Sequence, residues 1–74
     1  PEYKDISDFI DGVAVVLRGD FHGVIDKRGQ LLIPCAMDEI VRMKDAGLLR
    51  MEKQEKMAYF DLQAGRYMWK PNGF

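Results

Sequence analysis

The sequence predicts an all-β domain, with about six to eight short antiparallel strands arranged as repeated hairpins or a meander. Three observations lead to this prediction. Similar residues recur at intervals of 34 to 37 positions along the 74-residue chain. Short apolar runs rich in β-branched residues alternate with Gly, Asp and Pro, which form turns. Neither copy of the repeat shows a convincing helical pattern.

The repeat is clearest at residues that form or flank turns. A period near 35 residues is typical of repeated supersecondary units, none of which can bury its apolar face alone. We therefore expect one single domain, 1–74, that contains repeat units at 3–34 and 37–71. The matching residues and their spacings are Ile6 and Ile40 at 34, Gly12 and Gly47 at 35, Asp26 and Asp61 at 35, Gly29 and Gly65 at 36, and Pro34 and Pro71 at 37.

The first copy is expected to begin with a short strand and bend over 3–9 and to continue with a hairpin. Residues 13–17 form a continuous apolar run between turn residues, which predicts a buried strand. A short connection that contains Gly19 leads to a second strand at 21–25, and its length and composition indicate a tight hairpin.

A turn and a third strand follow this hairpin. Asp26 opens a four-residue turn that Gly29 closes, and the aspartate carboxylate is well placed to accept hydrogen bonds from the backbone amides of the turn. The third strand is expected over 31–33 and to end at Pro34.

The second copy repeats this order of strands and turns. Its hairpin is expected to contain a charged loop, 52–55, that is longer than the loop of the first copy, and its aspartate turn carries one more residue. The expected strands are 48–51, 57–61 and 66–69, the last of which precedes Pro71.

Residues 37–46, which open the second copy, fit either a strand or a short helix. Asp38 supplies a helix cap and Gly47 a stop signal, so a helix of two turns is one interpretation. The corresponding residues 6–10 of the first copy are too few and too β-branched for a helix. Because the two copies should share a structure, a strand is the preferred prediction.

Composition limits the class of protein. The chain is 47% hydrophobic and 31% charged, with a formal net charge of −1, which is ordinary for a soluble folded domain and gives no basic stripe for nucleic acid. No apolar run approaches the roughly 20 residues that span a membrane. Cys35 is the single cysteine, so an internal disulfide and a cysteine-rich zinc site are excluded. Since the chain begins with Pro1 and repeat arrays usually contain more units, we expect it to be part of a longer protein.

The first copy resembles one unit of the WG-repeat family, also called KWG repeats, and residues 37–71 resemble a second, degenerate unit. The Trp-Gly pair that names the family is replaced by His22-Gly23 in the first copy and by Met57-Ala58 in the second. The resemblance implies a β-rich bacterial repeat without catalytic residues and with an interaction or scaffold role. The matching residues are Asp5-Ile6, Phe9, Gly12-Val13-Ala14-Val15-Val16, Gly23-Val24-Ile25-Asp26, Gly29 and Ile33-Pro34.

The candidate binding residues are the aromatic side chains near the end of the chain, Tyr67, Trp69 and Phe74. Large aromatic residues are enriched both in binding surfaces and over small cores, so both interpretations remain open. The leading hypothesis is a non-catalytic module that binds another protein or a flanking domain through a sheet edge or this aromatic strip. The alternative is a small-ligand or carbohydrate site with Tyr67 and Trp69 as a stacking platform. A homodimer is also expected to be possible, because two repeats are few.

Other chemically capable residues have simpler structural explanations. Asp26 and Asp61 resemble a catalytic carboxylate pair, but both begin turns. His22 has no metal-ligand partner at a suitable spacing, and Cys35 has no neighbouring basic group to activate it. The adhesion-like tripeptide at 18–20 also suits a tight turn. We therefore expect no enzyme activity, no metal and no cofactor.

Overall fold

The computed structural model describes residues 3–43 and 47–74. The described residues contain eight antiparallel strands in two four-stranded sheets and no helix. This confirms the all-β fold and the predicted number of strands. The chain divides into two compact units, Pro1–Met37 and Asp38–Phe74, and each unit contains one sheet. That the two units make one domain stays a prediction.

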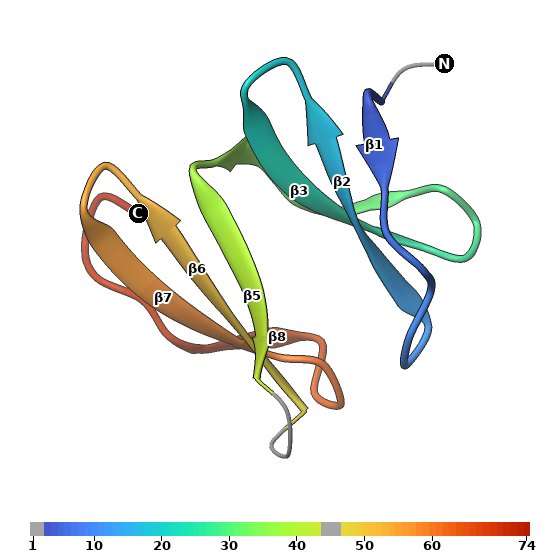
Figure 1. The fold of residues 1–74 in the computed structure, drawn as a ribbon. Helices are drawn as coiled ribbons and strands as arrows, with labels where there is room; N and C mark the ends of the chain where they lie inside the picture. The colour runs from blue at the N-terminus through green and yellow to red at the C-terminus, as the bar shows by residue number, and fades with distance from the viewer. Residues whose placement is uncertain (1–2, 44–46) are drawn as a thin grey trace. The chain divides into compact units, whose positions relative to one another are not determined.

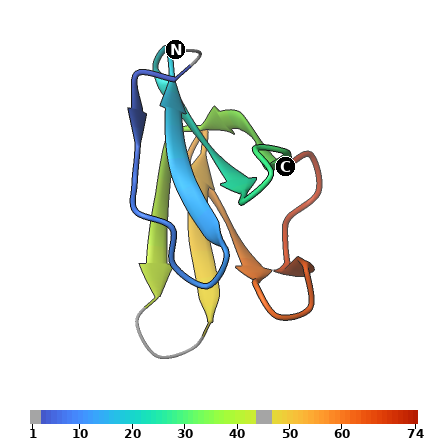
Figure 2. The same cartoon turned by 90° about the vertical axis from the view of Figure 1, so that its right-hand side faces the viewer.

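Each sheet is a meander in which every strand pairs with the next one along the chain (Figures 1 and 2). The first sheet consists of β1 (Asp5–Ile6), β2 (Val13–Arg18), β3 (Phe21–Asp26) and β4 (Leu31–Met37). The second consists of β5 (Glu39–Met43), β6 (Leu48–Lys53), β7 (Lys56–Asp61) and β8 (Arg66–Trp69).

The preferred prediction for the start of the second copy is correct where the structure describes it. β5 is a strand that pairs with β6 in regular register, from Glu39 opposite Glu52 to Met43 opposite Leu48. Residues 44–46 of the predicted segment lie outside the described residues.

Three buried side chains of the first unit have buried counterparts at matching positions of the second unit. Ala14, Val16 and Ile25 form a cluster in the first unit, with Tyr3 and Cys35 packed against it. Thirty-five residues later, Leu49, Met51 and Phe60 are buried in the second unit. Alternation along paired strands places each trio on one face of its sheet. The sequence period therefore relates these three core positions of the two units.

The two aspartate turns form as predicted. The Asp26 Oδ1 accepts hydrogen bonds from the backbone amides of Arg28 (2.9 Å) and Gln30 (3.0 Å). In the longer second turn, the Asp61 Oδ1 accepts bonds from the amides of Gln63 (2.9 Å) and Ala64 (3.2 Å). The glycine of each turn has a positive φ, 85° in the first and 69° in the second, which explains why glycine recurs there.

The prediction of a long loop over 52–55 is wrong. β6 extends to Lys53 and β7 begins at Lys56, so Gln54 and Glu55 form a two-residue turn. Both residues have positive φ angles, 52° and 68°, which is the pattern of a type I′ turn and suits the twist of a hairpin. The Asp38 Oδ2 accepts a hydrogen bond from the Gln54 amide at 2.9 Å and helps to hold this turn.

The prediction that Pro34 ends the third strand is also wrong, because β4 continues to Met37. Ile33 lies opposite Val24, and Met37 lies opposite His22. Between these two pairs, β4 advances by four residues while β3 advances by two. Pro34 lies in this irregular stretch of an edge strand. Proline is tolerated there because its missing N–H leaves no ladder bond unmade.

At Gly23 the backbone of β4 lies close to β3. A Cβ atom at this position would lie 2.7 Å from the Ile33 carbonyl oxygen and 2.8 Å from the Cys35 Sγ. The corresponding residue of the second unit, Ala58, is fully buried and carries a methyl group. The two copies thus share a topology but differ in how closely the last strand approaches the third.

Replacement of Gly23 by alanine is therefore expected to lower the free energy of unfolding by about 1–3 kcal/mol, the usual effect of overpacking. Urea-induced unfolding followed by circular dichroism measures this change. Addition of Cys35→Ala should restore only part of the loss, because the Ile33 carbonyl belongs to the backbone and remains. A Gly23→Ala variant as stable as the parent chain would contradict the close approach.

Candidate functional site

The predicted aromatic residues lie in the last part of the second unit, but they do not form a single strip. In β8, Tyr67 lies opposite Phe60 and Trp69 lies opposite Tyr59. Phe60 and Tyr59 are neighbours on β7, so their side chains point to opposite faces of the sheet. The register shift at this point adds Met68 to β8 and places Tyr67 and Trp69 on different faces.

Tyr67 belongs partly to the core of its unit. Its ring meets the buried Phe60 edge to face, with centroids 5.2 Å apart and an interplanar angle of 85°. Its hydroxyl group lies 3.8 Å from the Met51 Sδ, and Met51 is fully buried. Burial raises the pKa of the Tyr67 phenol above its ordinary value of 10.0, because desolvation disfavours the charged phenolate.

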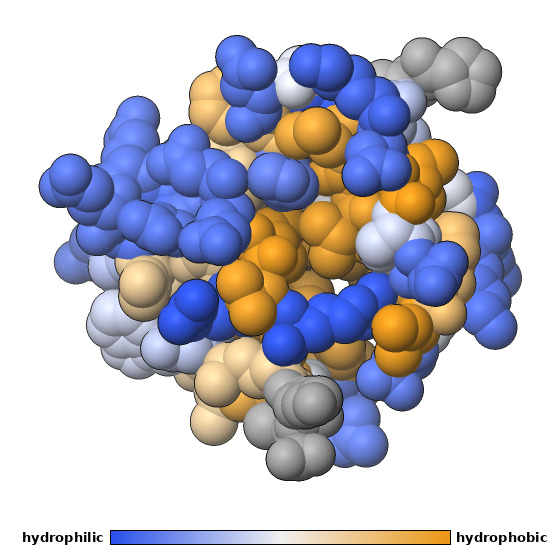
Figure 3. All heavy atoms as spheres, in the orientation of Figure 1, coloured by the Kyte–Doolittle hydropathy of each residue, from blue (hydrophilic) through white to orange (hydrophobic). Residues whose placement is uncertain are grey.

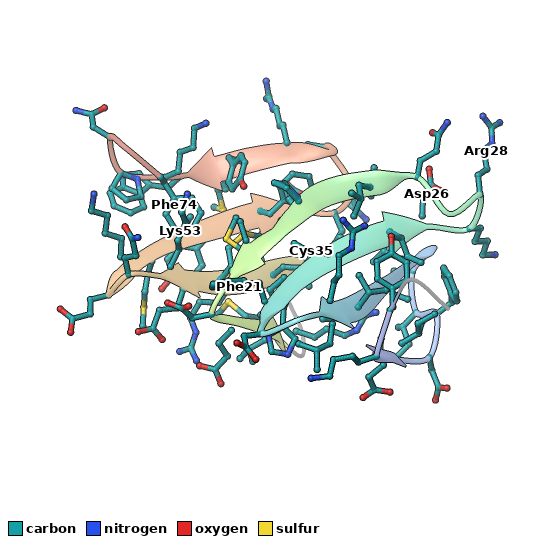
Figure 4. The ribbon with its side chains drawn as sticks, turned by 90° about the horizontal axis from the view of Figure 1, so that it is seen from above. Phe21, Asp26, Arg28, Cys35, Lys53 and Phe74 are labelled. Carbon is teal, nitrogen blue, oxygen red and sulfur yellow. The ribbon has the colours of Figure 1, made fainter. Side chains whose placement is uncertain are left out.

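Phe74 joins Tyr67 on the same face. The two rings make an edge-to-face contact with centroids 6.2 Å apart. The backbone near Phe74 folds back toward the β6–β7 hairpin, where the Lys53 Nζ donates a hydrogen bond of 2.9 Å to the Phe74 carbonyl oxygen. Figure 4 shows these two labelled residues side by side. The structure therefore brings Tyr67 and Phe74 together and leaves Trp69 apart.

Three lysines surround this aromatic pair. The Lys53 Nζ lies 6.0 Å from the centroid of the Phe74 ring, and the Lys70 Nζ lies 4.9 Å from the centroid of the Tyr67 ring. The Lys56 Nζ lies 3.3 Å from the point where a Cβ on Gly73 would be placed. We call Lys53, Lys56 and Lys70 the lysine cluster. Ammonium groups over ring faces are favourable cation–π contacts.

Trp69 and Met68 are the most exposed large apolar residues of the described chain. Trp69 is 57% exposed and Met68 is 67% exposed. They lie at the end of β8, which is an edge strand of its sheet. Their positions correspond to Ile33 and Leu32 of the first unit, where Ile33 is only 1% exposed. The same backbone position is thus a core position in one copy and a surface position in the other.

Sequence reasoning missed the lysine cluster. Lys53 and Lys56 are close in the sequence and meet across the short turn at Gln54-Glu55. Lys70 is distant in the sequence and belongs to the cluster because residues 71–74 return toward the hairpin. A correct prediction of that turn would have shown Lys53 directly opposite Lys56.

The other candidate residues serve local structure. The carboxylates of Asp26 and Asp61 each bind the amides of their own turn. Asp26 and Arg28 are labelled at the first of these turns in Figure 4. His22 pairs with Leu17 and Met37, and Cys35 is a half-buried free thiol. The described residues hold no group of three or more His, Cys, Asp or Glu that could bind a metal ion.

The tripeptide at 18–20 lies at the tip of the β2–β3 hairpin. Gly19 has a positive φ of 61°, as the tight turn requires. The Arg18 guanidinium lies 5.2 Å from the centroid of the Tyr3 ring, so it packs against the unit's own aromatic side chain.

A family model described as WG containing repeat matches residues 1–20 and 23–56, which is more than half of the chain. The chain belongs to the WG-repeat family. No curated protein and no solved structure matches it. The matched residues of this WG-repeat chain end before β8, so the aromatic pair and Lys70 are described from the structure alone.

The family assignment fits the structure of the first unit. Gly23 occupies the position of the glycine in the Trp-Gly pair after which WG repeats are named. The Ile33 carbonyl oxygen leaves no room there for a side chain. In the second unit Ala58 stands at this position. No helix within the described residues of the WG-repeat chain is long and apolar enough to span a membrane.

The raised pKa of Tyr67 predicts a loss of stability at high pH. The folded chain holds the phenolic proton more tightly than the unfolded chain, so the free energy of unfolding should decrease as the pH rises above 10.0 and through the folded pKa. Unfolding by urea between pH 8 and about 11.5, with tyrosinate absorbance measured in parallel, tests this.

The matched control is Tyr67→Phe, which keeps the ring contacts and removes the ionisable group. This variant should lose stability less steeply over the same pH range. An equal slope in the two proteins would contradict the role of Tyr67.

Proposed function

We propose that this chain is a non-catalytic β module that binds another protein or a flanking domain through the exposed end of the second unit. The observation that supports this proposal most directly is the exposure of Met68 and Trp69 on an edge strand. Aromatic and methionine side chains are enriched in protein interfaces, and their exposure to water is unfavourable until a partner covers them. Family membership supports the repeat architecture on which this surface is built.

Edge strands offer a second source of affinity. Their outward backbone groups can pair with an extended segment of a partner, and side chains that alternate along the strand add specificity. Figure 3 shows apolar residues that reach the surface between hydrophilic ones on the face drawn there. Such a mixture is common to interfaces and to the rest of a protein surface, so the proposal rests on Met68 and Trp69.

Carbohydrate binding is the weaker alternative. A sugar ring that stacks on both Tyr67 and Trp69 needs the two rings on one face, and the register of β8 places them on opposite faces. Trp69 alone, with the half-buried Tyr59 beside it, is the remaining aromatic surface.

Affinity capture of partners from the source cell, with quantitative mass spectrometry, tests the proposal. The control variant is Trp69→Ile, because Ile33 stands at the equivalent position of the first unit. We expect at least one protein to be captured by the parent chain and reduced about tenfold with the variant, in line with the loss of an aromatic anchor.

Trp69 also provides a direct reporter because it is the single tryptophan of the chain. Titration with a captured partner should shift its fluorescence emission to shorter wavelength as water is excluded from the ring. Sedimentation equilibrium over a tenfold concentration range shows whether that partner is a second copy of the chain. A monomer that captures no more protein than Trp69→Ile would contradict the proposal.

A further inference from the structure

We propose that the lysine cluster recognises an acidic peptide segment of the protein partner. This inference rests on the proposed function and adds the chemistry of the partner. Lys53 and Lys56 lie directly opposite each other beside the β6–β7 turn. Like charges in directly opposite positions of an antiparallel pair are destabilising. A carboxylate from a partner would relieve this repulsion.

Among the described residues, no Asp or Glu side chain forms an ion pair with the ammonium groups of the cluster. Lys53 donates to the Phe74 carbonyl oxygen, and Lys70 lies over the Tyr67 ring. Within the described residues, no ion pair to Asp or Glu satisfies any of the three lysines. Glu55 is exposed in the intervening turn and forms no ion pair with either neighbour in the described part of the chain. The positive charge of the cluster is therefore not neutralised by an acidic side chain of the described residues.

The first unit lacks this arrangement and serves as an internal comparison. The positions equivalent to Lys53 and Lys56 are Arg18 and Phe21, which also lie opposite each other beside a two-residue turn. One cation and one aromatic residue occupy that pair, and Arg18 packs on the Tyr3 ring. The opposed lysines are thus a property of the second copy and are not required by the hairpin.

The surroundings of the cluster suit a peptide better than a free anion. Tyr67 and Phe74 are half-buried rings between the lysines, and they offer apolar surface next to the positive charge. Lys70 follows Trp69 directly in the chain and lies over the Tyr67 ring, on the face of the sheet opposite to Trp69. A segment with carboxylates next to apolar side chains matches both features.

Selection of a phage-displayed library of random twelve-residue peptides on the parent chain tests the inference. We expect enriched peptides to carry two or more Asp or Glu residues next to an apolar residue. The affinity of a synthetic enriched peptide, measured by fluorescence polarisation, should fall about tenfold or more in the triple variant Lys53→Gln, Lys56→Gln, Lys70→Gln, since each screened charge pair contributes modestly. Higher salt should weaken binding to the parent chain.

The matched control removes the same number of positive charges from the first unit, with Lys4→Gln, Lys27→Gln and Arg28→Gln. Its peptide affinity should stay within twofold of the parent. Lys56→Gln alone should be at least as stable to urea as the parent, because it removes the opposed like charge. Urea unfolding of the triple variant itself, measured in the same way, shows whether its loss of binding results from unfolding.

The outcomes separate the inference from the proposed function. Peptides that bind without acidic residues, and equally well to the triple variant, would overturn the inference and leave the protein-binding proposal intact. A fluorescent twelve-nucleotide single-stranded DNA that binds as tightly as the peptide would also overturn it, because the cluster would then be a general polyanion surface. The absence of any enriched peptide on the parent chain would count against both.

Discussion

One extra residue, at matching positions in the last strand of each sheet, determines on which face of the sheet the neighbouring side chains of that strand lie. In β4 this residue is Leu32, between Leu31 opposite Ile25 and Ile33 opposite Val24. In β8 it is Met68, at the corresponding place. Without the bulge, residues two apart would share a face; with it, they lie on opposite faces. The positions of Tyr67, Trp69 and their partners all follow from this register.

Features that depend on local sequence could be predicted. Asp26 and Gly29 define their turn through the carboxylate of one and the positive φ of the other, and the second copy repeats both. The apolar run that starts at Val13 forms a strand because it is β-branched and bounded by turn residues. Because both copies form the same meander, the buried Ala14 of the first copy corresponds to the buried Leu49 of the second, 35 residues later.

Features that depend on pairing between strands could not be predicted. Pro34 is a strand terminator by local rules, but it continues β4 because it lies in an irregular stretch of an edge strand. Gln54 and Glu55 have no turn preference that indicates two consecutive positive φ angles. Their conformation is supported from outside the hairpin by Asp38, 16 residues earlier. The separation of Tyr67 from Trp69 has the same origin, because it depends on the strand beside them.

The opposed lysines would couple the stability of the second unit to the binding that we propose. In the folded unit, Lys53 and Lys56 are held directly opposite each other by the register of the hairpin. In the unfolded chain, the same two ammonium groups move apart and repel each other less. An anionic ligand that bridges them therefore binds the folded unit in preference to the unfolded chain and stabilises it in proportion to the logarithm of the ligand concentration. The repulsion within this pair would disfavour folding of the empty unit, and the proposed ligand would offset it.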